Sequence, residues 1–266
     1  MTQNDPSQED IKKTNKAVDA ALNFKDEGIT LRKVFEQDIA FVVFHDAAWA
    51  NVSHEPLEED DVDWTGSHHV RSQLGSLVLI TEKHAFSEGK GIFSIVDWKS
   101  KGSQRVCRST FAGETMACTE GVESALFLRC LFLSFAHGRH VSEDESGKFS
   151  PLHCITDCKS LYDHLHREGV PKAPTEKRLA VDLAGLRQIF LREARHQWLA
   201  RHQAGGEPTP ERPCRPPLHW MPTHLQLADL LTKEMNAGAW WQIMARGFFD
   251  FPLRSHARPE ENSGIL

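Results

Sequence analysis

The chain has 266 residues, enough for one large domain or for one domain with an appendage. Hydrophobic residues make up 40% of it and charged residues 26%, an ordinary balance for a globular protein that excludes wholesale disorder. No run approaches the ~18 uninterrupted apolar residues of a membrane-spanning helix, and the net charge of −6 argues against a uniformly basic surface.

Along the chain, the first predicted element is a helix at residues 7–27. Ser7 and Asp10 have the spacing of a capping box, and an apolar face follows, made of Ile11, Val18 and Leu22. Runs rich in β-branched and aromatic residues then predict four strands, at residues 29–35, 39–44, 76–81 and 91–98.

The second half of the chain alternates between the two kinds of element. A broad apolar face from Phe111 to Phe135 predicts a long helix. The remaining segments are a strand at 153–156 with a helix directly after it, a helix at 175–195, a proline-rich insert at 206–217, a strand at 218–222 and a helix at 225–234. This order predicts an α/β fold, with a mixed sheet flanked by helices.

The six cysteines, without a secretory signal, indicate a reduced intracellular compartment, cytoplasmic or nuclear. Only Cys154 and Cys158 lie close together in the sequence, with His153 beside them. Because no second pair stands at zinc-finger spacing, the sequence does not favour a zinc site.

Four acids stand at places where a mixed sheet can bring side chains together. Asp46 and Asp157 each follow a predicted strand, Glu114 lies in the first turns of the long helix, and Asp229 lies in the last helix. Clustered carboxylates repel one another unless a cation neutralises them, and hard oxygen ligands select Mg²⁺ or Mn²⁺. Two such ions roughly 3.5–4 Å apart support phosphodiester cleavage. A single acid at a strand end is more often a cap or turn residue, so spacing alone does not single out these four.

Between residues 99 and 108 the chain has four basic residues and no acid: Lys99, Lys101, Arg105 and Arg108. Contacts with a nucleic-acid backbone need only a local positive face, so this segment is predicted to bind phosphates. The other interpretation is a solvated surface. Trp98, beside the segment, is expected in the core.

The strings around the acids resemble the ribonuclease H domains of Copia-type retrotransposons. FVVFHDAAWAN (41–51) resembles the family's first strand and its catalytic Asp, at Asp46. Residues 94–132 resemble its Trp-Lys-Ser-Lys segment and helix start, with Glu114 on the catalytic Glu. CITDCKSLYDHL (154–165) and MPTHLQLADLLTK (221–233) resemble the third and fourth motifs, which places Asp157 and Asp229 on their acids.

The resemblance implies a ribonuclease H-like fold with a five-stranded mixed sheet over residues 37–236. Residues 1–36 would be the connecting segment that follows reverse transcriptase in these polyproteins, and residues 237–266 a C-terminal tail. The implied activity is cleavage of the RNA strand of RNA–DNA hybrids, with two Mg²⁺ or Mn²⁺ ions on the four acids. The implied partners are the hybrid and a reverse transcriptase domain or subunit.

The string WMPTH (220–224) resembles retroviral ribonuclease H instead, which implies a role for His224 in product release or proton transfer. The other interpretation is a plain surface histidine. Phe111, Ala112 and Thr115 depart from the family's helix start. Two alternatives therefore stay open: a degenerate, catalytically inactive copy that binds nucleic acid or protein, and another nuclease of the same superfold, such as an integrase or exonuclease.

Overall fold

The computed structural model describes residues 7–23, 25–26, 28–53, 70–167, 169, 174–203, 215–233, 235 and 238–250. Residues 55–63, which carry six acids in the string EPLEEDDVD, and most of the proline-rich insert at 206–217 lie outside the described residues.

The strands form one six-stranded sheet in the order β5-β4-β1-β2-β3-β6. Their bounds are β1 Ile39–Ser53, β2 Val70–Glu82, β3 Lys90–Gly102, β4 Leu152–Thr156, β5 Leu218–Trp220 and β6 Phe248–Asp250. β1, β2 and β3 are antiparallel neighbours, whereas β4 runs parallel to β1 and to β5. The predicted mixed α/β architecture is confirmed, and β6 gives the sheet one strand more than the five expected.

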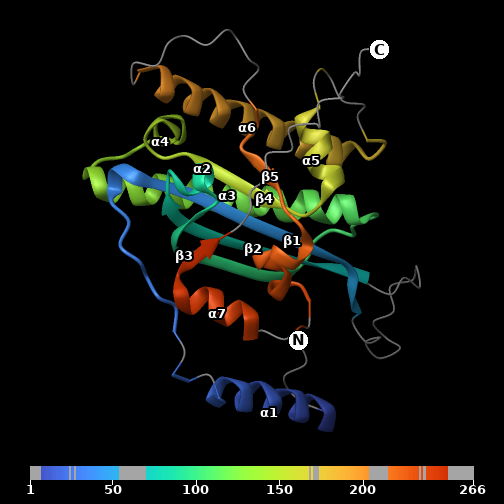
Figure 1. The fold of residues 1–266 in the computed structure, drawn as a ribbon. Coiled ribbons are helices and arrows are strands. Elements are labelled where there is room, and N and C mark those ends of the chain that lie inside the picture. Colours follow the sequence, from blue (N-terminus) through green and yellow to red (C-terminus); the bar gives the residue numbers. More distant parts are fainter. Residues whose placement is uncertain are drawn as a thin grey trace, which may run out of the picture.

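The helices lie on both faces of this sheet (Figure 1). Their bounds are α1 Gln8–Asn23, α2 Ala85–Glu88, α3 Thr110–His137, α4 Glu143–Phe149, α5 Lys159–His166, α6 Lys177–Gln203 and α7 Gly238–Arg246. Short 3₁₀-helices accompany them in the described part of the chain: η1 Glu36–Asp38, η3 Thr223–Leu225 and η4 Leu227–Leu231. Helices α3 to α6 cover one face, and α7 lies on the other (Figure 1).

Alternation along β1 divides the core in two, because successive side chains of a strand point to opposite faces of the sheet. Phe41, Val43 and Ala47 pack with α3 and α6 in one cluster. Val42 and Phe44 pack with η4 and α7 in the other. The sheet is therefore buried on both faces at its centre, which explains the continuous apolar run that preceded Asp46 in the sequence.

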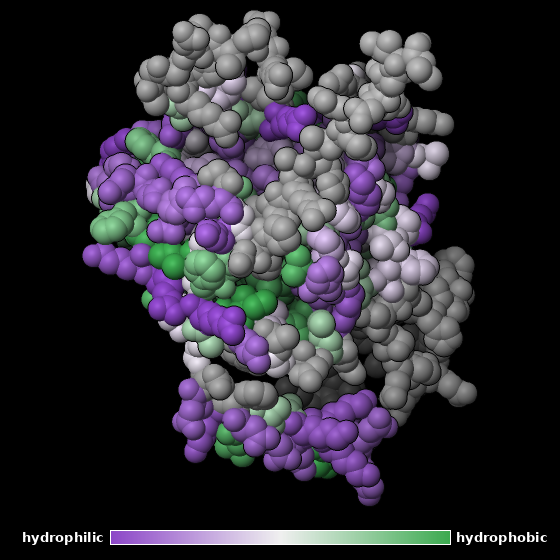
Figure 2. Space-filling view, in the orientation of Figure 1, coloured by the Kyte–Doolittle hydropathy of each residue, from purple (hydrophilic) through white to green (hydrophobic). Residues whose placement is uncertain are grey.

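Helix α1 agrees with its predicted capping box, since Ser7 N–H donates to Asp10 Oδ2 at 3.0 Å and Asp10 N–H donates to Ser7 Oγ at 3.2 Å. Its apolar residues nevertheless stay exposed, and no residue of the helix is buried. In the space-filling view α1 is mainly hydrophilic, whereas apolar colour gathers over the region of α7 (Figure 2).

Three segment predictions need correction. Residues 29–35 form no strand, because Arg32 bonds through its backbone to the Ser94 side chain and not to a strand ladder. The segment at 225–234 contains η4 instead of an α-helix. Residues 238–250 form α7 and β6, and β6 pairs with β3, so the sheet continues beyond residue 236. Among the described residues, none of the helices has the length and apolar character needed to cross a bilayer.

Candidate metal centre

Asp46 lies within β1, not at its end as the sequence suggested, because β1 continues to Ser53. Its neighbour β4 is shorter: the pairing of β1 with β4 ends at Phe44 and Ile155. β1 therefore runs past the end of β4, and beyond that point its backbone forms a hydrogen bond with a side chain of another element. Ala47 N–H donates to Glu114 Oε1 at 3.3 Å.

Glu114 is placed by the start of α3. Ser109 caps the helix, with its Oγ accepting from Ala112 N–H at 3.1 Å. Gly113 lets the first turn approach β1, since a Cβ there would lie 3.3 Å from the Ala47 Cβ. The helix thus places Glu114 beside the part of β1 that extends past β4, and Glu114 is buried there, with 4% of the residue exposed.

Asp157 follows the last residue of β4, and Thr156 Oγ1 accepts from Cys158 N–H at 3.1 Å in the turn. The Trp220 indole of β5 donates to Asp157 O at 3.1 Å, which fixes the backbone of this acid. One carboxylate oxygen each of Asp46, Glu114 and Asp157 lies within 4.8 Å of the others. Three separate segments therefore place three acids in one group that could hold a metal ion.

The electrostatics of the group suit a hard cation. Burial raises the pKa of Glu114, and the Asp46 and Asp157 carboxylates raise it further, against the lowering effect of His45. Glu114 Oε2 is buried and lacks a hydrogen-bond partner. An all-oxygen donor set with an unsatisfied buried oxygen matches the ligands that Mg²⁺ or Mn²⁺ takes, so the residues present fit such an ion.

Asp229 lies beside this group on η4 and is 7% exposed. Lys233 joins it to the acids, because its Nζ lies 2.8 Å from Asp229 Oδ1 and 3.4 Å from Asp46 Oδ2. Thr232 Oγ1 donates to Asp46 Oδ2 as well. Burial raises the pKa of Asp229, with Lys233 opposing and Asp46 adding to the rise. An ammonium group thus stands between two of the four predicted ligands.

His45 of β1 and Gly75 of β2 determine how closely η4 lies against the sheet. Gln226 donates through Nε2 to His45 O at 3.0 Å and accepts from Ala228 N–H at 3.3 Å. Gly75 of β2 pairs in register with Asp46, and a Cβ at Gly75 would lie 2.7 Å from Thr232 Cγ2. η4 can therefore lie against the sheet only because this position carries no side chain.

The basic segment is largely paired with acids of the chain itself. Lys99 Nζ donates to Ser124 Oγ at 3.0 Å and lies 3.7 Å from Asp97 Oδ2. Lys101 pairs with Glu120 at 3.0 Å, and Arg105 pairs with Asp182 at 2.9 Å. Arg108 is exposed and lines a cleft between the segment before α3 and the start of α6.

Two further predicted residues have clear positions. Trp98 is 57% exposed, so its assignment to the core was wrong. It pairs with Leu77 on the η4 side of β3, whereas Lys99 points to the other face, where it bonds Ser124 of α3. His224 is exposed on η3, and no hydrogen bond or ion pair joins it to the carboxylates among the residues that the structure describes.

The sequence analysis missed Lys233, Gln226 and Gly75. Lys233 was visible at four residues after Asp229, a spacing at which side chains meet on a helix, but its reach to Asp46 depends on the packing of η4. Gly75 carried no local signal, because the close approach it permits involves residues more than 150 positions away.

Comparisons with known proteins add little to this geometry. No protein-family model matches the chain, and no curated protein matches it. Among solved structures, the N-terminal ribonuclease H domain of rv2228c from Mycobacterium tuberculosis, solved as a fusion with maltose binding protein, is similar with a TM-score of 0.36 and 12% identity. The match covers 73% of this chain and 91% of that one. A likeness of this degree carries no weight for function, which rests on the site.

Proposed function

We propose that this chain is a metal-dependent endonuclease of retroelement origin that cleaves the RNA strand of RNA–DNA hybrids. The observation that carries the proposal is the carboxylate group of Asp46, Glu114 and Asp157, with ligand oxygens within 4.8 Å of one another. These are three of the four acids that the motif resemblance selected from among 37 in the chain. The mixed sheet flanked by helices is consistent with the fold that the same resemblance implies.

In this proposal the three acids, with Asp229 at the edge of the group, hold two Mg²⁺ or Mn²⁺ ions. Bound there, such ions supply an activated water and stabilise the leaving oxygen in phosphodiester cleavage. The chain's own task is to fix the ligands. The Ala47 N–H orients Glu114, Thr232 orients Asp46, and the Trp220 indole fixes the backbone of Asp157.

The basic segment would contact the hybrid through β3 and the loop before α3. Phosphate contacts give affinity without sequence reading, so hybrid binding should weaken steeply as salt is raised. Arg108 is the member of the segment with no ion pair among the described residues, and its replacement by Ala should therefore weaken hybrid binding more than replacement of Lys101. His224, in this proposal, assists product release, and His224→Ala slows turnover without abolishing it.

The decisive test is cleavage of an end-labelled RNA–DNA hybrid by the full chain with Mg²⁺, Mn²⁺ or Ca²⁺. Cleavage is expected with the first two, and Ca²⁺ should permit binding with little cleavage, because its looser coordination positions water and phosphate less well. Asp157→Asn should lower the rate by more than about 100-fold, equivalent to a few kcal/mol of lost charge stabilisation. Asp163→Asn, an exposed acid in α5, is the matched control and should leave the rate unchanged. Metal-independent cleavage, or full activity of Asp157→Asn, would contradict the proposal.

A second candidate is a degenerate copy that keeps the fold but does not cut. The observation in its favour is Lys233, whose ammonium group contacts both Asp46 and Asp229 and so occupies the side of the group where a cation would bind. Hybrid binding without cleavage under any metal, in the unmodified chain and in Lys233→Met, would select this candidate.

A further inference from the structure

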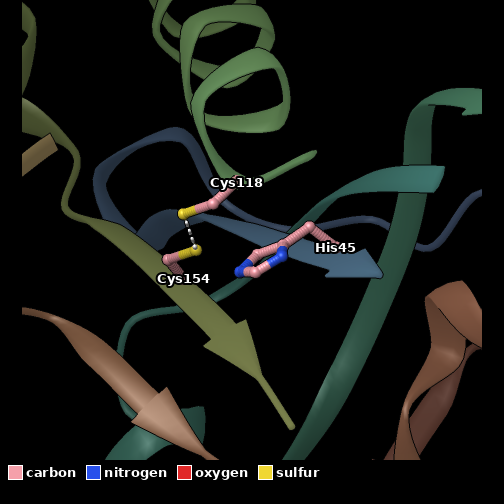
Figure 3. Close-up of side chains that lie close together, drawn as sticks. All are labelled: His45, Cys118 and Cys154. Carbon is pink, nitrogen blue, oxygen red and sulfur yellow. Dashed lines mark hydrogen bonds between the residues drawn. The ribbon is translucent and has the colours of Figure 1, made fainter. Parts of the chain in front are cut away.

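A second cluster of potential ligands lies close to the carboxylate group, on the α3 side of the sheet. His45 comes from β1, Cys118 from α3 and Cys154 from β4, and their side chains point toward one another (Figure 3). One ligand atom of each lies within 4.8 Å of the other two. All three side chains are fully buried.

The imidazole is the unusual member of this cluster. Although its ring is fully buried, neither Nδ1 nor Nε2 makes a hydrogen bond of good geometry among the described residues, and its polar neighbours are the Cys154 thiol and the Glu114 carboxylate. A buried polar group without a partner costs roughly 1–3 kcal/mol, and buried side-chain nitrogens are nearly always satisfied. One ring nitrogen faces the two sulfur atoms (Figure 3), so the cluster contains an unsatisfied lone-pair donor beside two thiols.

The two sulfur atoms have the separation that a shared metal ion requires. Cys118 Sγ and Cys154 Sγ lie 3.8 Å apart. Two thiolates bound to one tetrahedral zinc ion at about 2.3 Å each would also lie about 3.8 Å apart. A disulfide needs about 2.05 Å, and the two cysteines sit in the middle of α3 and of β4, where neither backbone can easily move.

We propose that His45, Cys118 and Cys154 bind one thiophilic divalent ion, with Zn²⁺ as the reference metal. Two thiolates and a neutral imidazole balance the charge of Zn²⁺, so the occupied site carries no net charge into the core. The two thiol protons leave to solvent on binding. This donor set is softer than the carboxylate group, and the two sites therefore select different metals.

The far side of the imidazole faces the carboxylate group, since His45 Nδ1 lies 3.5 Å from Glu114 Oε2. A carboxylate behind a metal-bound histidine is a common arrangement, in which the acid orients the ring. The zinc site thus contacts the carboxylate group through one shared residue, Glu114. It does not depend on the proposed nuclease activity, because none of its three ligands belongs to the carboxylate group.

Cobalt provides the test, because Co²⁺ bound to thiolate gives a near-ultraviolet charge-transfer band that carboxylate-bound Co²⁺ lacks. The untagged, reduced full chain is refolded with Co²⁺ in the presence of excess Mg²⁺. Refolding is used because the cluster is enclosed and such sites load with folding. We expect one equivalent of Co²⁺ per chain, the charge-transfer band, and loss of that band when Zn²⁺ is added.

Cys118→Ser and Cys154→Ser should lose the band, whereas Cys130→Ser, a change in the same helix but outside the cluster, should keep it. Circular dichroism of each variant shows whether it has folded. If a variant does not fold, the presence or absence of the band in the unmodified chain alone decides the case. Absence of the band in the unmodified chain overturns the proposal, as does a band that survives both cluster variants. A Cys118–Cys154 disulfide found by peptide mass mapping of the non-reduced chain would overturn it as well.

Discussion

Gly75→Ala tests whether the approach of η4 to the sheet builds the metal centre. The added Cβ would lie 2.7 Å from Thr232 Cγ2, 2.8 Å from Leu231 Cβ and 3.2 Å from Ala228 O. Ordinary carbon–carbon contacts are about 3.5–4.0 Å. The Leu231 Cβ is fixed to its own backbone, so rotation of a side chain cannot relieve the clash, and η4 must withdraw by roughly 1 Å.

Two effects follow from this displacement. Overpacking of this kind costs about 1–3 kcal/mol of unfolding free energy. Thr232 and Asp229 move with η4, so the groups that orient Asp46 shift, and a misplacement of about 1 Å can lower a catalytic rate by roughly 100-fold. We therefore expect a modest loss of stability and a large loss of hybrid cleavage.

The assays are urea unfolding and single-turnover hydrolysis of the hybrid in Mg²⁺. Gly102→Ala is the matched control, because it lies in the same sheet and a Cβ there meets nothing within 4 Å. Alanine is a better strand residue than glycine, so the control should be neutral or up to about 1 kcal/mol more stable. If Gly75→Ala unfolds at the same urea concentration as the control, η4 does not pack as described. Equal cleavage rates would mean that η4 has no part in the site.

Three further perturbations give independent checks. Lys233→Met removes the ammonium group between Asp46 and Asp229, so the metal-free variant should melt at a lower temperature than the unmodified chain. Added Mg²⁺ should then raise the melting temperature of the variant more than that of the unmodified chain. An unchanged response to Mg²⁺ would show that Lys233 does not compete with the ion. Glu193→Ala removes the carboxylate that lies 2.7 Å from the buried Arg129 guanidinium, and the free energy of unfolding in urea should fall by about 3–5 kcal/mol. The double change of Arg129→Met and Glu193→Leu removes both charges and should recover much of that loss. Burial lowers the pKa of His219 from 6.5 to about 4, so the free energy of unfolding should fall as pH falls from 6.5 toward 4, by about 3 kcal/mol at pH 4. His219→Phe should make the free energy of unfolding less dependent on pH in this range. An unaltered pH dependence in the variant would contradict the lowered pKa of His219.

The strings around Asp46, Glu114 and Asp157 single out these three acids through their resemblance to ribonuclease H motifs. Strand and helix patterns alone did not, because an acid at a strand end or a helix start is more often a cap or turn residue. A continuous apolar run did indicate a strand buried on both faces before Asp46. The mixed α/β class followed from the same alternation of periodicities, because burial and backbone hydrogen bonding force such elements into layers.

The identity of each side chain's neighbours was decided by tertiary packing alone. Lys101 and Arg105 form an unpaired basic segment in the sequence but meet Glu120 and Asp182 from other elements in the fold.

The cysteines show the same limit. Cys154 and Cys158 stand together in the sequence, yet Cys154 meets Cys118, a residue 36 positions earlier, and His45. Strand alternation sends Cys154 to the α3 face and His153 to the other, where it meets His219 at 3.0 Å. Sequence spacing is informative within one helix or strand, where geometry is periodic, but contacts between elements depend on how whole faces pack.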